Sequence, residues 1–291
     1  MTITADMIKD LRQQSGAGIM ECKEALKESG GDMEKSLDYL RKKGAGKAAK
    51  KADRATKEGS VAVAAGPGAA ALAEIKCETD FVSRNERFQD LARQLAAQTL
   101  SAGEGAGDEE FLAQKLVSGA APTVQDLING RVHELGENIQ LGRRARFTRT
   151  GPGAYGSYVH GMGSIGVVVE LAAPSETAAA DPAFVDLARD LAMHVAASNP
   201  HAVSQEGLSA AAVAKEREIF EAQVRESGKP ENIVPKIVEG KMKKYYTEVC
   251  LVEQPFVKDP DKSVGQLLKE AGARLGGAVA VTRFARFQLG E

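Results

Sequence analysis

The feature that most constrains the fold of this chain is an internal duplication of its central and C-terminal parts. A nine-residue pattern that begins at Phe88 returns at Phe184, 96 residues later. A second pattern, from Gly136 to Phe147, returns 140 residues later, from Gly276 to Phe287. The difference between these two shifts, 140 − 96 = 44, places about 44 extra residues in the second copy, between residues 192 and 264. A repeated unit of this length predicts two related subdomains.

Each copy has the pattern of a small sheet covered by helices. It begins with two apolar segments around a glycine turn, and the glycines of this part align at a shift of 97: Gly59 with Gly156, and Gly66 with Gly163. A long helical pattern follows, and a shorter helix and a strand close the unit. This order predicts an α+β fold with helices on one face of a small antiparallel sheet. In the first copy, the run Ala71–Ile75 predicts a strand of a half-buried sheet.

The extra residues of the second copy predict a helical hairpin. Two apolar stripes at helical spacing lie on either side of a break at Ser227–Pro230: Val213, Phe220 and Val224, then Ile237, Val238, Met242 and Tyr245. We therefore expect two antiparallel helices over about residues 205–247 that protrude from the sheet. A contact arm and a family-specific ornament without a function are both open as interpretations of this hairpin.

The first part of the chain predicts three short helices that each bury one face. Their apolar residues recur at a spacing of three and four: Met7, Ile8 and Leu11, then Ile19, Cys22 and Leu26, then Met33, Leu37 and Leu40. Glycine-rich breaks separate the helices, and Asp32 is the expected N-cap of the third. The basic stretch Lys42–Arg54 that follows is interpreted as a solvated linker or an exposed helix, with RNA or phosphate binding as the alternative.

Composition places the chain among ordinary globular proteins. Its 291 residues are 43% apolar and 27% charged, which is enough for two or more domains. No apolar window predicts a membrane span, and the first residues lack the pattern of a signal peptide, so we expect a cytoplasmic protein. The net charge of −2 argues against a generally basic surface that coats nucleic acid. Cys22, Cys77 and Cys250 are odd in number and far apart, which predicts buried thiols and no disulfide framework.

The sequence contains no recognisable catalytic or metal-binding constellation. Its four histidines are not spaced as metal ligands on one helix face, and no acidic cluster accompanies them. The segment Gly151–Gly156 has the glycine spacing of a dinucleotide-binding loop, but it leads into an expected strand, whereas phosphate binding needs the loop to open a helix. We therefore expect no enzyme, no metal and no cofactor. A phosphotransfer enzyme that uses the glycine-rich turns is the least favoured interpretation.

The segment Glu78–Asn85 directly follows the strand of the first copy and carries Phe81 among polar residues. Its Thr79, Asp80, Ser83 and Asn85 favour turns and helix starts, so the segment is predicted to be an exit loop. A large aromatic side chain there either packs under its own loop or is held out as a contact for another protein. Residue chemistry alone favours the first of these.

Several ordered motifs resemble those of bacterial translation elongation factor Ts. The segments that carry the resemblance are Leu11–Leu26, Cys77–Val82, Gly136–Ile139, His194–Ser198 and Gly265–Glu270. The resemblance runs from about Thr4 to Gly290. It implies a helical domain of the ubiquitin-associated (UBA-like) type, two related core subdomains, and a coiled-coil arm. These features agree with the domains expected from the patterns above, residues 1–54, 55–150 and 151–291.

The resemblance also implies guanine nucleotide exchange on elongation factor Tu, the GTPase that delivers aminoacyl-tRNA, in its GDP-bound and nucleotide-free states. It implies that one group of residues disturbs the magnesium site of this partner, with Phe81 wedged between helices of the GTPase domain: Thr79, Asp80, Phe81 and Val82. A second group is implied to lie in the same interface: Ile19, Met20, Leu135, Gly136 and His160.

Structural interpretations stay open for three residues of the second group: a core position for Ile19, a turn for Gly136, and a sheet residue for His160. The resemblance implies exchange through protein–protein contact, without a cofactor, a small-molecule substrate, a membrane or a direct nucleic-acid contact. The alternative is a ribosome- or RNA-associated binding module without exchange activity.

Overall fold

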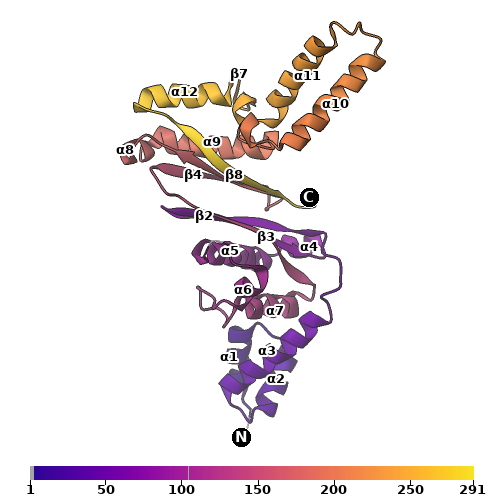
Figure 1. Cartoon of the computed structure of the whole chain (residues 1–291). Helices are drawn as coiled ribbons and strands as arrows, with labels where there is room; N and C mark the ends of the chain where they lie inside the picture. Colours follow the sequence, from indigo (N-terminus) through magenta and orange to yellow (C-terminus); the bar gives the residue numbers. More distant parts are fainter. Residues whose placement is uncertain (1–2, 104) are drawn as a thin grey trace. The chain divides into compact units, whose positions relative to one another are not determined.

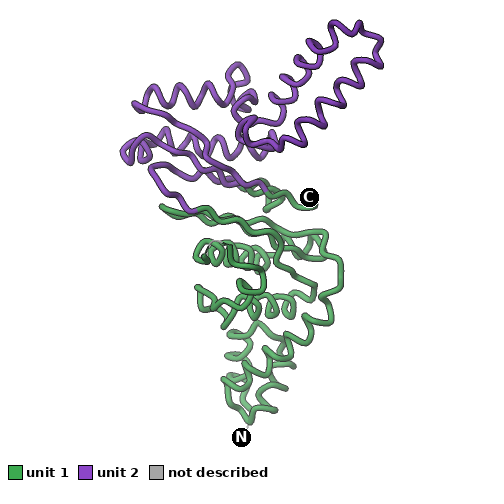
Figure 2. The backbone as a smooth tube through the Cα atoms, in the orientation of Figure 1, with its two compact units in different colours: residues 1–147, 159–166, 287–291 green, residues 148–158, 167–286 purple. Residues whose placement is uncertain are grey.

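The structure is a computed structural model that describes residues 3–103 and 105–291. Residues 1, 2 and 104 fall within the expected domains 1–54 and 55–150 and lie outside the described residues. The chain divides into two compact units (Figure 2). Unit 1 comprises Met1–Phe147, Val159–Gly166 and Phe287–Glu291, and unit 2 comprises Thr148–Tyr158 and Val167–Arg286.

Unit 1 begins with three helices and continues with a three-stranded sheet and its covering helices (Figure 1). In chain order its elements are α1 (Ala5–Ser15), α2 (Ile19–Glu28), α3 (Met33–Ala49), β1 (Glu58–Ala65), β2 (Ala69–Cys77), α4 (Asp80–Ser83), α5 (Glu86–Ser101), α6 (Asp108–Ala113), α7 (Val124–Leu135) and β3 (Ile139–Thr148).

The three N-terminal helices form where the apolar spacing predicts them. The Thr4 hydroxyl accepts a hydrogen bond from the Met7 N–H and caps α1, and Asp32 caps α3 by accepting from the Lys35 N–H at 3.0 Å, as expected. The helices share a buried apolar cluster: Leu11, Ala17, Cys22, Ala25, Leu26 and Leu40.

One detail of this region differs from the sequence-based expectation, and another decides between two interpretations. Ile19 was expected on the buried face of α2, but its side chain is 57% exposed, because the buried face of this helix is formed by Cys22, Ala25 and Leu26. In the basic stretch Lys42–Arg54, α3 continues to Ala49, so the interpretation as a largely exposed helix is confirmed for the first part of this stretch, although the large apolar residues of α3 end at Leu40. The extension is stabilised by contact with α7.

The sheet of unit 1 has the strand order β1-β2-β3, and β1 and β2 are antiparallel, with Glu58 opposite Cys77. Helix α5 packs on β1 and β2, and α7 packs on α5. The expectation of a half-buried β2 is wrong, since nearly every residue of this central strand is buried. Even Glu74 is buried, because Arg143 of β3 binds its carboxylate at 2.9 Å.

The second copy repeats this order of elements and adds a helical pair. Most of it lies in unit 2, but the end of β4, the turn after it, the start of β5 and the end of β8 belong to unit 1. Its elements are β4 (Gly153–His160), β5 (Ile165–Ala172), α8 (Glu176–Ala179), α9 (Pro182–Ser198), the 3₁₀ turn η1 (Gln205–Gly207), α10 (Ala210–Glu226), α11 (Val234–Val249), the 3₁₀ turn η2 (Leu251–Glu253), β6 (Pro255–Phe256), β7 (Asp259–Ser263), α12 (Val264–Leu275) and β8 (Ala280–Gln288). Its main sheet has the order β4-β5-β8, which matches β1-β2-β3.

The duplication is visible in matching local structures. Phe88 of α5 and its repeat partner Phe184 of α9 are both fully buried. Gly136, for which a turn was one open interpretation, and its repeat partner Gly276 end α7 and α12 with φ values of +79° and +76°. That backbone conformation favours glycine. The chain is thus a mixed α/β protein with two sheets of the same topology.

The alignment of the first strands at a shift of 97 is wrong. A side chain at Gly59 would overlap the carbonyl of Ile75, and a side chain at Gly153 would overlap the carbonyl of Leu171. Ile75 and Leu171 are themselves repeat partners at a shift of 96, so Gly59 corresponds to Gly153 and not to Gly156. Gly156 has another role, since its backbone lies directly against Ala188 of α9.

The extra residues of the second copy contain α10 and α11, which pack against each other. Their contact is a separate apolar cluster built around Val224, Val234, Val238 and Met242. Within the described residues no helix is long and apolar enough to cross a membrane. Cys22, Cys77 and Cys250 are buried and free, as expected.

Candidate functional site

The short helix α4 forms because two polar residues cap consecutive helices directly after β2. The Thr79 hydroxyl accepts a hydrogen bond from the Val82 N–H at 3.4 Å, and Asn85 accepts from the Arg87 N–H at 2.9 Å. The predicted helix starts at Thr79 and Asn85 are therefore confirmed, whereas the expected exit loop between them is a helical turn. Between the two caps the chain makes a single helical turn, which carries Phe81.

Phe81 is the most exposed large apolar residue of the described chain, with 84% of its surface accessible. Its neighbour Val82 instead packs against the core of unit 1. Asp80 is half-buried and pairs with Arg84 at 3.3 Å on the surface of the helix. The interpretation that packed Phe81 under its own loop is wrong, because α4 directs Val82 inward and leaves Phe81 in solvent.

The second copy contains the same capped turn without the aromatic residue. Ser175 caps α8 by accepting from the Ala178 N–H at 3.1 Å, as Thr79 caps α4. At the shift of 96 the partner of Phe81 is Thr177, which is also exposed. The fold thus forms this turn with a small polar residue at the exposed position, so folding does not require Phe81.

The start of α4 is bound by a carboxylate from the end of α7. The Oε2 atom of Glu137 accepts hydrogen bonds from the backbone N–H groups of Glu78 and Thr79 at 3.1 and 3.0 Å. Its Oε1 atom accepts from the Thr79 hydroxyl at 2.6 Å. In return, the Glu78 carboxylate accepts from the Asn138 N–H at 2.6 Å. Because ionised acceptors make the stronger hydrogen bonds, this contact fixes the chain where it leaves β2.

The turn of α7 explains why Glu137 reaches this position. Leu135 is half-buried against the core, and Gly136 ends the helix in the left-handed conformation while its N–H donates to the Val132 carbonyl. Lys51 also donates a hydrogen bond to the carbonyl of Gly136. Gly136 is therefore a turn residue, as one open interpretation had it, and it directs the next side chain toward α4.

The other end of α4 is bound by Gln89 of α5. Its Nε2 atom donates to the carbonyl of Ser83, the last residue of α4, at 2.7 Å, and to the carbonyl of Met162 at 3.2 Å. Met162 follows His160 in the turn after β4 and is 54% exposed. His160 is the last residue of β4, so the interpretation as a sheet residue is confirmed; it is exposed, and its carbonyl accepts from the Gly163 N–H. Gln89 thus brings α4 and the turn of His160 together.

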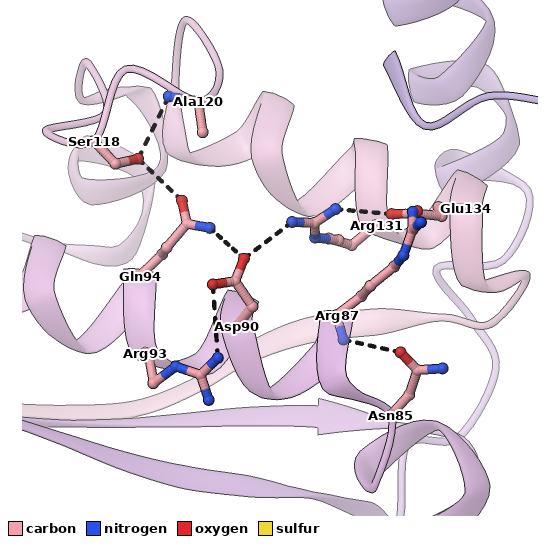
Figure 3. Close-up of polar contacts among 9 residues, drawn as sticks. All are labelled: Asn85, Arg87, Asp90, Arg93, Gln94, Ser118, Ala120, Arg131 and Glu134. Atoms are coloured by element: carbon pink, nitrogen blue, oxygen red, sulfur yellow. Dashed lines mark hydrogen bonds and ion pairs between the residues drawn. The ribbon is translucent and has the colours of Figure 1, made fainter. Parts of the chain in front are cut away.

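Figure 3 shows a polar network that joins α5 to α7. The Glu134 carboxylate contacts Arg87 and lies 2.8 Å from Arg131. Arg131 also reaches Asp90 at 3.2 Å, and Gln94 donates to the same carboxylate at 2.7 Å. The Glu134 side chain is only 10% exposed, and a buried charge without a partner is costly. The two arginines compensate this charge. The network fixes α5, which follows α4, against α7, which ends just before Glu137.

Ile19 and Met20 lie at the first turn of α2, and the Met20 side chain is 74% exposed. Ile19 lines one surface groove with residues of α1 and with Arg87 of α5. The structure thus connects the predicted residues Thr79–Val82, Leu135, Gly136 and His160 through Glu137 and Gln89, and connects Ile19 through Arg87.

Two ionisable groups near the site have pKa values shifted by burial. Burial and the nearby Glu137 carboxylate raise the pKa of the Cys77 thiol to about 12, so this cysteine stays protonated and unreactive. Burial lowers the pKa of His133, although its ring lies 2.8 Å from Glu21. No group of three potential metal ligands occurs in the described ranges. What remains is an exposed apolar side chain on a backbone held at both ends.

Sequence reasoning missed the residues that hold α4, chiefly Glu137 and Gln89. One signal was available in the duplication. At the same repeat positions the second copy has Gly277 and Val185. The two polar side chains that bind the ends of α4, Glu137 and Gln89, thus occur only in the copy that contains Phe81.

Comparison with known proteins adds a family context to this geometry. A family model described as Elongation factor TS matches residues 78–291. The chain is similar to the Elongation factor Ts of Nitratidesulfovibrio vulgaris (strain DP4), with 48% identity over 293 residues that cover 100% of this chain and 97% of that protein. The Elongation factor Ts of Trichlorobacter lovleyi is 45% identical, with coverage of 100% and 94%. That of Lawsonia intracellularis is 43% identical, with both chains fully covered.

Proposed function

The chain belongs to the elongation factor Ts family, and from this premise we propose that it is the guanine nucleotide exchange factor of the GTPase elongation factor Tu. It binds the GDP-bound form, disturbs the magnesium site and promotes GDP release during translation elongation. The observation that carries the proposal is Phe81, a large apolar side chain that is 84% exposed on a helix held at both ends. Aromatic side chains are enriched in the cores of protein interfaces, where a few buried anchors supply most of the binding energy, and Phe81 is held in a position to become such an anchor.

The proposed mechanism needs no catalytic side chain. Magnesium and the residues around the phosphates compensate the charge of the bound diphosphate, so a shift of the element that supports the metal weakens GDP binding. Phe81 is the group that inserts between helices of the GTPase domain, and Thr79, Asp80 and Val82 belong to the same contact. Asp80 lies beside Phe81 on the surface, whereas Val82 packs inward and Thr79 caps α4, so these two contribute by supporting the helix. The protein therefore acts through protein–protein contact and is not an enzyme in the usual sense.

The rest of the proposed interface is formed by residues around α4. We propose that Ile19, Met20, Leu135, Gly136 and His160 contact the same GTPase domain. The exposure of Ile19, Met20 and His160 supports this role. Leu135 is half-buried against the core, so its contribution is to support the turn at Gly136.

The finer architecture belongs to the same proposal. Residues 1–54 form a UBA-like domain with a basic linker, residues 55–150 form the first core subdomain, and residues 151–291 form the second. The second subdomain binds a β-barrel domain of the partner, and the helices within about residues 205–247 form a protruding coiled-coil arm. We propose a cytoplasmic location, without a membrane, nucleic-acid or small-molecule partner.

The rival function, an RNA- or ribosome-associated binding module, rests on the basic stretch Lys42–Arg54. In unit 1 several of these cations already have acidic or carbonyl partners: Lys43 binds Glu24 at 2.7 Å, Lys47 binds Glu21, and Lys51 binds the carbonyl of Gly136. Those contacts leave less free charge for phosphates, so they favour the exchange function. A steep loss of affinity with salt would point back to RNA.

Linkage supplies the test of this function. If the protein weakens GDP binding by some factor, GDP must weaken binding of the protein by the same factor. Titration calorimetry against nucleotide-free and GDP-bound elongation factor Tu should therefore give a much higher affinity for the nucleotide-free form. Equal affinities for the two forms would exclude an exchange factor and leave a plain binding protein.

A further inference from the structure

We propose that Glu137 is a positioning residue for nucleotide exchange: its carboxylate holds the start of α4 so that Phe81 is presented in a fixed orientation. The inference rests on the proposed function and deepens it, because it assigns a role to a residue that touches Phe81's helix and not the partner. Glu137 is 58 residues from Thr79 in the sequence, and it makes three hydrogen bonds to Glu78 and Thr79.

The chemistry of these bonds suits a clamp. Both backbone N–H groups point to one carboxylate oxygen, Oε2, while the Thr79 hydroxyl donates to the other, Oε1. The same hydroxyl oxygen also accepts from the Val82 N–H and so caps α4. Glu137 thereby fixes the direction of the Thr79 hydroxyl hydrogen, so that a lone pair of the hydroxyl oxygen points to the Val82 N–H of the helix. The carboxylate orders the cap as well as the backbone.

The second copy shows that the clamp is not needed to form the turn. The repeat partner of Glu137 is Gly277, which has no side chain and lies directly against Pro174. Helix α8 nevertheless forms behind its Ser175 cap, and its exposed residue is Thr177. A carboxylate clamp and an exposed aromatic residue thus occur together in one copy and are both absent from the other. This pairing indicates that the clamp serves Phe81 and not the fold.

The physical reason is the small size of α4. A single helical turn of four residues is only marginally ordered by its own hydrogen bonds. Without Glu137, the start of this turn would have to be ordered when the partner binds, and that lost entropy would weaken binding. With Glu137, the ordering precedes binding. The clamp therefore increases the fraction of molecules whose Phe81 is ready to insert.

The test compares three variants of the full chain: Glu137→Ala, Glu137→Gln and Glu109→Ala. The last is a matched control, since Glu109 is an exposed glutamate in the first turn of α6. Hydrogen exchange of the Glu78 and Thr79 amides is measured in the free protein, and release of labelled GDP from elongation factor Tu is measured with each variant. Melting temperatures identify any variant that has lost its fold.

In Glu137→Ala, we expect the Glu78 and Thr79 amides to exchange at least about tenfold faster. The acceleration of GDP release should fall about tenfold, because at least one hydrogen bond to a charged group is lost. Glu137→Gln should stay within about threefold of the natural protein, because its amide oxygen accepts both N–H groups and its NH₂ group donates to the Thr79 hydroxyl oxygen. Glu109→Ala should change neither quantity.

Several results would overturn the inference while leaving the proposed function intact. One is a natural protein that accelerates GDP release but exchanges the Glu78 and Thr79 amides as fast as open loops. This result needs only the natural protein, so it decides the question even if Glu137→Ala does not fold. Another is equal loss of release in Glu137→Gln and Glu137→Ala with both amides still protected, which would mean that Glu137 acts by its charge on the partner. If the natural protein does not accelerate release at all, the proposed function itself fails.

Discussion

Truncation of Phe81 separates its role in a partner contact from any role in folding. Because this side chain is 84% exposed, its contacts within the protein are few, and Phe81→Ala should change the free energy of unfolding by no more than about 0.5 kcal/mol. The matched control is Phe88→Ala, at a fully buried position of the neighbouring helix α5. Loss of that side chain should destabilise the protein by about 3–5 kcal/mol.

For nucleotide exchange per folded molecule the order should be reversed, with a larger effect of Phe81→Ala than of Phe88→Ala. An aromatic anchor in an interface typically contributes about 2 kcal/mol or more, so Phe81→Ala should slow GDP release roughly thirtyfold or more per folded molecule. Phe81→Thr, which installs the residue of the second copy, should behave alike. Chemical denaturation and the release of fluorescent GDP from elongation factor Tu measure the two quantities. A large loss of stability in Phe81→Ala with unchanged exchange per folded molecule would refute the reasoning.

Three further predictions concern the scaffold around the site. Burial opposes ionisation of Glu74, but the hydrogen bonds and charge of Arg143 outweigh it and hold the pKa of this carboxyl below its ordinary value of 4.5. The stabilisation that the Glu74–Arg143 pair contributes is therefore complete above pH 4.5 and is lost as the pH falls through the lower folded-state pKa. The free energy of unfolding, measured as a function of pH, should fall less steeply in acid for Glu74→Gln than for the natural protein. Gly163→Ala should destabilise the turn after β4, because φ is +96° and the new side chain would overlap Ser60; an unchanged melting temperature would contradict this. Replacement of residues 205–247 by a short glycine linker should leave cooperative thermal unfolding of the rest, since α10 and α11 have their own apolar cluster and loop closure costs little; loss of that transition would place the pair in the core.

Local signals in the sequence were sufficient for the helix starts and the repeated topology. Thr79 and Asn85 cap consecutive helices because their short polar side chains reach the free N–H groups of the next turn, which depends on neighbouring residues alone. Gly136 ends α7 for a similarly local reason. The recurrence of Phe88 as Phe184 then indicated that the whole unit is built twice.

The features that the sequence did not predict depend on contacts between distant segments. Apolar spacing assigned Ile19 to the buried face of α2, but only the packing of the three helices decides which part of that face is covered. The exposure of Phe81 follows from the direction that Val82 takes into the core. Glu137 lies in the motif Gly136–Ile139, but it reaches Thr79 across 58 residues, so no local pattern assigns it to α4, and its replacement by Gly277 in the second copy gives a hint.

The central claim is that this chain accelerates nucleotide release from elongation factor Tu. The most direct measurement is the rate at which fluorescent GDP leaves the purified GTPase in excess unlabelled nucleotide, with and without a catalytic amount of this protein. We expect a release rate that rises with the concentration of the protein, by about tenfold or more, and that rises far less with Phe81→Ala. A release rate that is the same with and without the natural protein would contradict the account.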